Sequence, residues 1–284
     1  MAIAYLNEGA TSLAAANWSD AAGFANNATL VINAGTQTIT TSLDQSQVNK
    51  SIDSLDIISP FGGNIYGASF APLISDVDGS ADTAATPVSR LRYWPSAGVM
   101  YFSAAGVSGV CHYLQVGGSG QLNLVGGDTK HVHLQDAGEL NVGQSATSGA
   151  SGTWHLNGGK SFIDSHASDT LVTVKVTAGT HYIKRAFTTS TGALYVYGGN
   201  VTLDLGGGDV PVLGIYGGTV RIIGASFDSS SRLELLGGTL DLSQLSRAIT
   251  FTTATHAPTA TVINKPSLVT WTTPVKIGSG AKGL

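Results

Sequence analysis

Charged residues are scarce in this chain. Asp, Glu, Lys and Arg make up only 11% of the 284 residues, hydrophobic residues make up 42%, and the formal net charge is −4. Intrinsic disorder requires the opposite combination, low hydrophobicity with high charge. A net negative chain also lacks the electrostatic attraction to phosphates on which nucleic-acid binding depends. The composition therefore predicts a folded protein with no nucleic-acid partner.

Cysteines, long apolar runs and early basic residues are also missing. Cys111 is the only cysteine, which excludes a disulfide framework and a cysteine-based zinc site. No apolar run approaches the roughly 18 residues of a membrane span. The first basic residue is Lys50, so the N-terminus lacks the positive region of a secretory signal. We expect no membrane partner, and we expect Cys111 to be a buried hydrophobic residue.

Helical patterns are nearly absent, and glycine is abundant. Residues 9–26 contain the one helix-like stretch, which Gly9 and Gly23 limit to a short element. The 37 glycines do not recur at every third position, which excludes a collagen helix. Elsewhere the chain consists of short runs of alternating β-branched and polar residues, each ending at glycine. This pattern predicts an all-β protein.

An internal repeat is the most informative feature. Residues 194–203, 213–222 and 233–242 each read as strand, Gly-Gly corner and strand, with offsets of 19 and 20 residues. One copy cannot bury its apolar residues alone, whereas stacked copies form a continuous core. The three expected inward columns are Leu194, Leu213 and Leu233; Val196, Ile215 and Leu235; and Val201, Val220 and Leu240.

The repeat favours a parallel β-helix (solenoid). An antiparallel sandwich would also give short strands with frequent turns, but it does not explain recurrence at 19 or 20 residues. We expect an N-terminal arm or cap at 1–28 and irregular first coils over 29–109, with an inserted loop at 70–97. Regular coils should span 110–250, and a C-terminal strand cap with a flexible tail should span 251–284.

Outward positions of the repeat should also form columns. Thr202, Arg221 and Asp241 should lie about 4.8 Å apart from coil to coil, which would allow an Arg221–Asp241 ion pair. Tyr197 and Tyr216 should form a short aromatic ladder. Such rings would either cover the corner or face a partner subunit.

Two stretches share short runs with a known protein family. Those in residues 29–67 are Val31-Ile32-Asn33-Ala34-Gly35, Thr38-Ile39-Thr40-Thr41-Ser42-Leu43-Asp44-Gln45-Ser46, Ser54-Leu55-Asp56-Ile57 and Phe61-Gly62-Gly63; those in 113–124 are Tyr113-Leu114-Gln115-Val116-Gly117 and Gly120-Gln121-Leu122-Asn123-Leu124. They resemble small β-helical virion surface proteins of tailed bacteriophages, of the capsid decoration (cement) or head-fibre type. The resemblance implies a homotrimer on the outer surface of the capsid, with the major capsid protein as partner and no catalytic residues.

We therefore expect a structural virion protein that binds the capsid and stabilises the head, not an enzyme. Residues 1–49, which lack Lys and Arg, are the expected capsid-facing part. An alternative is a short tail fibre or tailspike that binds a receptor glycan, with Tyr195, Tyr197, Tyr216 and Trp154 as candidate residues. A polysaccharide-cleaving enzyme is the third possibility.

Carboxylate pairs are the candidates for such cleavage. Asp204 with Asp209, and Asp164 with Asp169, flank turns, and glycosidases need two carboxylates about 5 to 10 Å apart. We favour turn-forming aspartates. The neighbours Cys111 and His112 should point to opposite faces of a strand, so they form no nucleophilic pair. We therefore predict no catalytic residue.

Two patterns could bind metal, and neither fits well. The segment 76–82 resembles a calcium loop, but Gly79 is at position 4 instead of 6, and Pro87 occupies the place of the bidentate Glu. His131 and His133, with His155 from another coil, could supply three nitrogens. Because the alternating Val132 and Leu134 should be buried, we expect these histidines to face solvent or an interface. We predict no metal and no cofactor.

Overall fold

The chain forms two compact units, Met1–Gly149 (unit 1) and Ala150–Leu284 (unit 2). The structure is a computed structural model. It describes residues 3–11, 17, 19, 28–40, 52–66, 73–74, 90–103, 110–147, 152–164, 171–184, 186–187, 191–206, 208–224, 231–263, 267, 269–271 and 276–277. Among these residues, no helix is long and apolar enough to cross a membrane.

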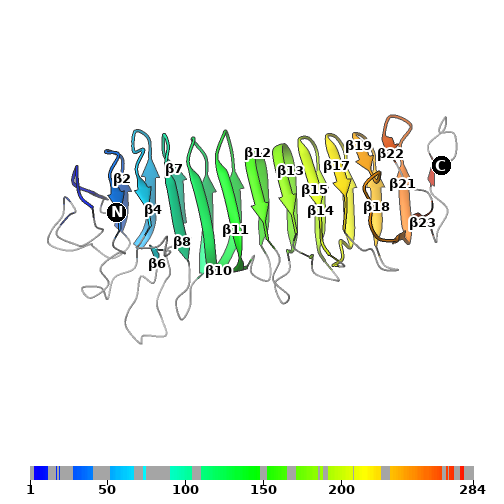
Figure 1. Cartoon of the computed structure of the whole chain (residues 1–284), viewed down its shortest axis with the longest axis horizontal. Coiled ribbons are helices and arrows are strands. Elements are labelled where there is room, and N and C mark those ends of the chain that lie inside the picture. The colour runs from blue at the N-terminus through cyan, green and yellow to red at the C-terminus, as the bar shows by residue number, and fades with distance from the viewer. Residues whose placement is uncertain are drawn as a thin grey trace. The chain divides into compact units, whose positions relative to one another are not determined.

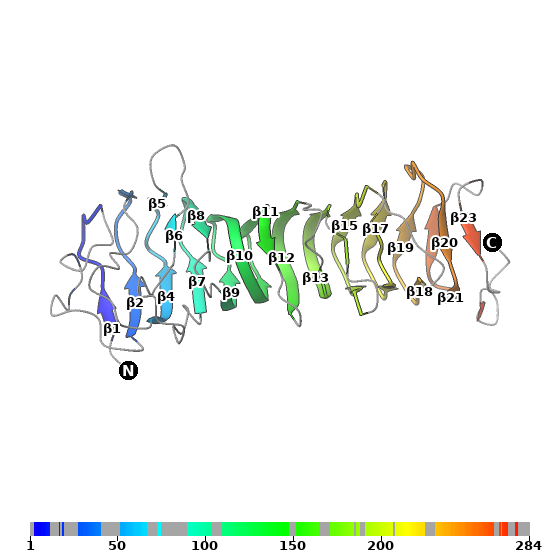
Figure 2. The same ribbon diagram turned by 90° about the horizontal axis from the view of Figure 1, so that it is seen from below.

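Unit 1 is built from parallel strands in two rows. Its strands are β1 (Ile3–Tyr5), β2 (Ala28–Ile32), β3 (Thr38–Ile39), β4 (Ile52–Ile58), β5 (Asn64–Ile65), β6 (Leu73–Ile74), β7 (Arg90–Trp94), β8 (Val99–Ser103), β9 (Val110–Val116), β10 (Gln121–Leu134) and β11 (Glu139–Thr147). One row runs β1, β2, β4, β7, β9 and the second half of β10. The other runs β3, β5, β8, the first half of β10, and β11. The first row is easiest to follow in Figure 2.

Unit 2 repeats this plan with more regular coils. Its strands are β12 (Thr153–Ile163), β13 (Thr173–Ile183), β14 (Ala193–Val196), β15 (Asn200–Leu203), β16 (Val212–Ile215), β17 (Thr219–Ile222), β18 (Arg232–Leu235), β19 (Thr239–Asp241), β20 (Ile249–Phe251), β21 (Thr253–His256), β22 (Thr261–Ile263), β23 (Val269–Trp271) and β24 (Lys276–Ile277). From β13 the chain continues through β14, β16, β18 and β21 in one row, and through β15, β17, β19 and β22 in the other. Successive coils lie side by side in Figure 1.

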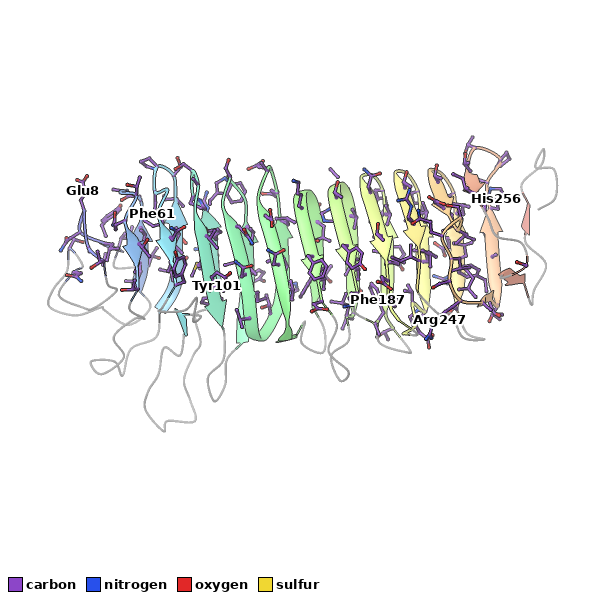
Figure 3. The ribbon with its side chains drawn as sticks, viewed as in Figure 1. Glu8, Phe61, Tyr101, Phe187, Arg247 and His256 are labelled. Atoms are coloured by element: carbon purple, nitrogen blue, oxygen red, sulfur yellow. The ribbon has the colours of Figure 1, made fainter. Side chains whose placement is uncertain are left out.

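The predicted parallel β-solenoid is confirmed. Leu194, Leu213 and Leu233 are register partners and are buried. The other two predicted columns, one from Val196 and one from Val201, are equally in register and buried. Large aromatic side chains fill the remaining core, including Phe61 in unit 1 and Phe187 in unit 2 (Figure 3).

The Gly-Gly corners turn the chain from one row to the other. Gly218 has φ +71°, a conformation that side chains other than glycine rarely adopt. A Cβ at Gly218 would also collide with the carbonyl oxygen of Gly199 in the preceding coil. The close stacking of the corners therefore requires glycine, which explains why the repeat keeps this pair.

The solenoid extends beyond the predicted boundaries. β1 lies within the predicted arm 1–28, but it pairs in register with β2. β7 lies within the predicted loop 70–97, but it pairs with β4 and β9 because Leu91 and Tyr93 alternate into the core. In the predicted cap, β21 and β22 stack on β18 and β19 as a further coil. Most of the helix-like stretch 9–26 and residues 278–284 of the expected C-terminal cap and tail lie outside the described residues.

Candidate functional site

Three tyrosines gather on an outward face of unit 2; we call Tyr195, Tyr197 and Tyr216 the tyrosine cluster. The rings of Tyr197 and Tyr216 stack with centroids 4.9 Å apart and planes 11° apart, which confirms the predicted ladder. The ring of Tyr195 is 6.4 Å from that of Tyr216. Tyr197 is 50% exposed. The cluster therefore presents aromatic surface to solvent.

Gly214 lies beneath these rings. It is the register partner of Tyr195 in the next coil. A Cβ at Gly214 would be 2.7 Å from Cδ1 of Tyr195 and 2.9 Å from Cε2 of Tyr216. The missing side chain thus allows both rings to pack against the strand, and an aromatic ring across from a glycine is a known way to stabilise a sheet.

A charged pair borders the cluster. The hydroxyl of Tyr216 donates to Oε2 of Glu234 at 2.7 Å, and Nε of Arg232 is 3.1 Å from Oε1 of the same carboxylate. The hydrogen bond to Glu234, with burial, raises the pKa of Tyr216 to about 12. The phenol therefore stays protonated and donating at neutral pH. Stacked rings beside fixed polar groups can bind a ligand with both apolar and hydroxyl-bearing faces.

Trp154 does not belong to this cluster. Its side chain is completely buried in the core of unit 2, so the prediction that it contributes to a surface for glycans is wrong. On β12 the inward residues alternate with outward polar residues, and Trp154 is at an inward position, next to its register partner Val174 on β13.

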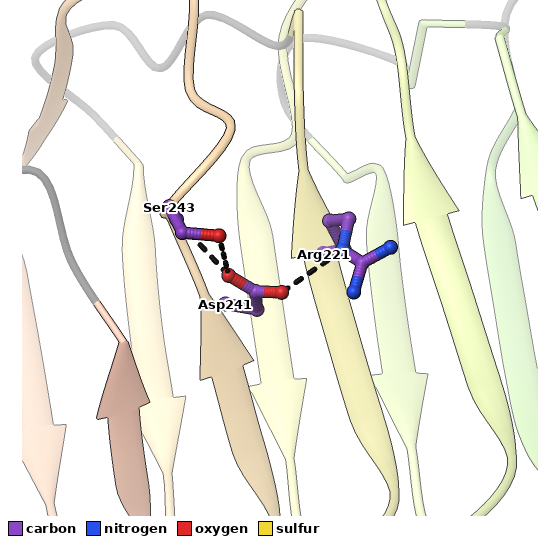
Figure 4. Close-up of polar contacts among 3 residues, drawn as sticks. All are labelled: Arg221, Asp241 and Ser243. Atoms are coloured by element: carbon purple, nitrogen blue, oxygen red, sulfur yellow. Dashed lines mark hydrogen bonds and ion pairs between the residues drawn. The ribbon is translucent and has the colours of Figure 1, made fainter.

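The predicted ion pair is formed, and its carboxylate is buried. Nε of Arg221 lies 2.9 Å from Oδ2 of Asp241, while the backbone N–H and hydroxyl of Ser243 donate to Oδ1 at 3.0 and 2.6 Å (Figure 4). Burial alone would raise the pKa of Asp241, but the hydrogen bonds from Ser243 and Arg221 hold it below its usual value. Asp241 thus links two coils as a carboxylate.

Two of the four candidate carboxylates, Asp204 and Asp164, also connect coils. Asp204 accepts a hydrogen bond from the hydroxyl of Tyr182, whose ring stacks on Phe162 with centroids 5.2 Å apart. Burial, with the bond to Asp204, raises the pKa of Tyr182 to about 12. Asp164 pairs with Lys184 at 3.5 Å. These contacts bring Asp204 to Tyr182, a partner that the sequence did not predict. Asp169 lies outside the described residues.

A buried polar pair was missed at the sequence level. His181 is in the core of unit 2, with Nδ1 3.0 Å from the hydroxyl of Ser161 and Nε2 2.7 Å from the carbonyl oxygen of Ala178. Burial lowers the pKa of His181. The neutral ring therefore donates through Nε2 and accepts from Ser161. Extending the 20-residue period back from Val201 by one and two coils places His181 and Ser161 at inward positions.

The histidines of unit 1 point outward as predicted. His131 and His133 are partly exposed, whereas Val132 and Leu134 are buried. Burial, followed by the charge of His131, lowers the pKa of His133. Among the described residues, no three His, Cys, Asp or Glu side chains gather closely enough to hold a metal ion. The segment 76–82 and the side chains of Cys111 and His112 are outside the description.

Comparison with known proteins gives no relative for this arrangement. No protein-family model matches the chain, and neither a curated protein nor a solved structure matches it.

Proposed function

We propose that this chain is a capsid decoration protein of a tailed bacteriophage, which binds the outer surface of the head as a homotrimer and stabilises it. The resemblance of residues 29–67 and 113–124 to such proteins supports the proposal. So does the β-solenoid fold, although a tail fibre could share that fold. Binding of three symmetric copies would multiply weak contacts through avidity.

Two exposed apolar side chains on the first strand carry this proposal. Ile3 and Tyr5 are 53% and 46% exposed, and they flank the buried Ala4 on β1. They belong to the segment 1–49, which contains no Lys or Arg. Exposed apolar groups on a surface without basic side chains are suited to burial against another protein. This strand is therefore the proposed contact with the major capsid protein.

The acidic side chains of unit 2 fit a structural role. Asp164, Asp204, Glu234 and Asp241 each bond to a side chain of a neighbouring coil. Catalytic carboxylates must instead be available to substrate. Cross-coil bonding at these positions supports a protein whose task is to remain rigid on a particle surface.

Cosedimentation with heads tests the proposal. Heads of the phage that encodes the chain, assembled without it, should bind the wild-type protein. The variant Ile3→Ser/Tyr5→Ser should lose this binding, whereas Ile263→Ser, which removes a similarly exposed apolar side chain from unit 2, should retain it. Wild-type protein that stays in the supernatant would contradict the proposal.

Point variants are preferable to deleting residues 1–49. That deletion would remove β2, whose buried Leu30 and Ile32 pack next to β4. Loss of head binding by the truncated chain would then reflect a damaged core as much as a missing contact.

Glycan recognition by a fibre is the second candidate function, and the tyrosine cluster favours it. Stacked, exposed rings next to Glu234 and Arg232 are suited to a sugar ring. Binding of the wild-type chain to a glycan array, lost in Tyr197→Ala/Tyr216→Ala, together with no binding to heads, would favour this function over capsid decoration.

A further inference from the structure

Two arginines are exposed side by side on the first row of unit 1. On β7, Arg90 and Arg92 point outward while Leu91 and Tyr93 are buried. Two residues along a strand correspond to about 6.7 Å. The register places Arg90 beside Ser54 of β4 and Tyr113 of β9. β4, β7 and β9 follow one another in Figure 2.

Arg92 is held by an aromatic ring. Its guanidinium carbon lies 5.6 Å from the ring centroid of Trp94, a cation–π contact. Trp94 in turn packs against Gly117 of the next coil, where a Cβ would be 2.7 Å from the ring. The glycine thus makes room for the indole, and the indole positions the guanidinium.

Arg90 is held by the preceding strand, β4. Its Nε donates to the hydroxyl of Ser54 at 3.4 Å, and that hydroxyl is also hydrogen-bonded to the carboxylate of Asp56. Ser54 is buried. Arg90 is therefore supported by the preceding coil and Arg92 by Trp94 of its own strand, an arrangement that reduces the entropy lost when a ligand binds.

Side chains on the neighbouring strands β9 and β10 add further hydrogen-bond donors next to the two arginines. Gln115 of β9 is the register partner of Arg92, and His131 and His133 of β10 are partners of Tyr113 and Gln115. The ring of Tyr113 stacks on His131 with centroids 5.1 Å apart and planes 20° apart. Guanidinium, amide, phenol and imidazole groups can all donate hydrogen bonds. Asp56, the register partner of Arg92 on β4, contributes the facing negative charge.

We propose that this surface, formed by Arg90, Arg92, Trp94, Tyr113 and Gln115, binds an acidic polysaccharide through its carboxylate or sulfate groups. Guanidinium groups match such oxyanions in shape and charge. Their separation along β7 allows the two arginines to contact anionic groups on successive sugar residues. This site is distinct from the proposed capsid contact on β1 and from the tyrosine cluster of unit 2.

The ring contacts and the exposed side chains of this surface favour a polysaccharide over a nucleic acid or a protein. Single-stranded nucleic acid needs free ring faces for base stacking, but Tyr113 stacks on His131 and Trp94 carries Arg92. A protein interface needs an apolar centre, and among the described residues of β4, β7, β9 and β10 only Tyr113 is an exposed large hydrophobic side chain. A hydrated, oxygen-rich polymer fits this surface best.

Binding of the full chain to defined polymers tests the site. Polygalacturonate supplies carboxylates, dextran sulfate supplies sulfates, and unmodified dextran is the neutral control. We expect calorimetry at low salt to detect at least one acidic polymer and not dextran, and the responding polymer identifies the anionic group. Arg90→Gln/Arg92→Gln should bind roughly tenfold or more weakly, because hydrogen bonds to charged groups are lost.

A variant with the same change of net charge distinguishes binding at the two arginines from nonspecific electrostatic attraction. Lys160→Gln/Arg247→Gln changes the net charge equally at two exposed positions of unit 2 and should bind like the wild type. Equal weakening of both double variants, no binding of either acidic polymer, or tighter binding of single-stranded DNA would overturn the proposal. If Arg90→Gln/Arg92→Gln does not fold, Arg90→Lys/Arg92→Lys keeps the charge and should still weaken binding; unchanged binding would overturn the proposal.

Discussion

His181 occupies a core position that the following coils fill with apolar side chains. Its register partners in the following coils are Val201, Val220 and Leu240. The ring is accommodated only because Ser161 and the carbonyl of Ala178 satisfy both nitrogens. Since protonation would leave a charged imidazole buried in the core, the folded protein favours the neutral form, which accepts from Ser161.

This preference makes stability depend on pH. Burial lowers the pKa of His181 in the folded chain, so below about pH 6.5 the unfolded chain takes up more protons. The resulting stability is present above pH 6.5 and is lost as the pH falls from 6.5 toward the folded pKa. We predict that Ser161→Ala/His181→Val, which extends the apolar column, loses less stability between pH 7.5 and 5.5 than the wild type.

Urea unfolding at the two pH values measures this difference. His155→Gln removes a partly exposed imidazole of the same unit and serves as the control, which should keep the pH dependence of the wild type. If the core double variant and the wild type lose the same stability on acidification, His181 is not the group responsible.

Among the structural elements, the glycine corners set how closely coils can stack. Gly218 combines φ +71° with a carbonyl oxygen in the space that a Cβ would need, whereas Gly206 has φ +62° and nothing within 4 Å. We predict that Gly206→Ala costs about 1–2 kcal/mol of unfolding free energy from backbone strain alone. Gly218→Ala should cost clearly more, because the neighbouring coil must also move.

Chemical denaturation of the two alanine variants provides the comparison. The pair shares the backbone conformation and differs in the contact between coils. Equal destabilisation of both variants would mean that close stacking at the corner contributes nothing beyond the positive φ.

The regular coils could be predicted from sequence because their lengths are nearly constant. Offsets of 19 and 20 residues bring Leu194, Leu213 and Leu233 into register, and the same offsets predict the Arg221–Asp241 pair. In unit 1 the partners Thr29, Ser54 and Arg90 are 25 and 36 residues apart. Insertions of this size hide the period, which is why the sequence pattern predicts a loop where β7 lies.

The surface sites could be predicted only where the coils have a constant length. Tyr197 and Tyr216 follow from the repeat because both precede a Gly-Gly pair. The Tyr182–Asp204 bond joins positions 22 residues apart, so one coil length does not reveal it. Arg90 meets Ser54 and Tyr113 across coils of unequal length, and only the three-dimensional register brings them together.

The proposed capsid binding depends on assembly of the whole molecule into a trimer. A single contact as small as Ile3 and Tyr5 would bind a capsid weakly, and threefold repetition would strengthen it through avidity. The scarcity of charged residues, 11% of the chain, leaves surfaces that can be buried between subunits. A homotrimer is therefore the central claim about the assembled protein.

Light scattering after gel filtration tests that claim most directly. For a homotrimer we expect a mass three times the 28.9 kDa of one chain, unchanged on moderate dilution. A monodisperse mass of 28.9 kDa would contradict the trimeric decoration protein and would point to a solenoid that acts alone.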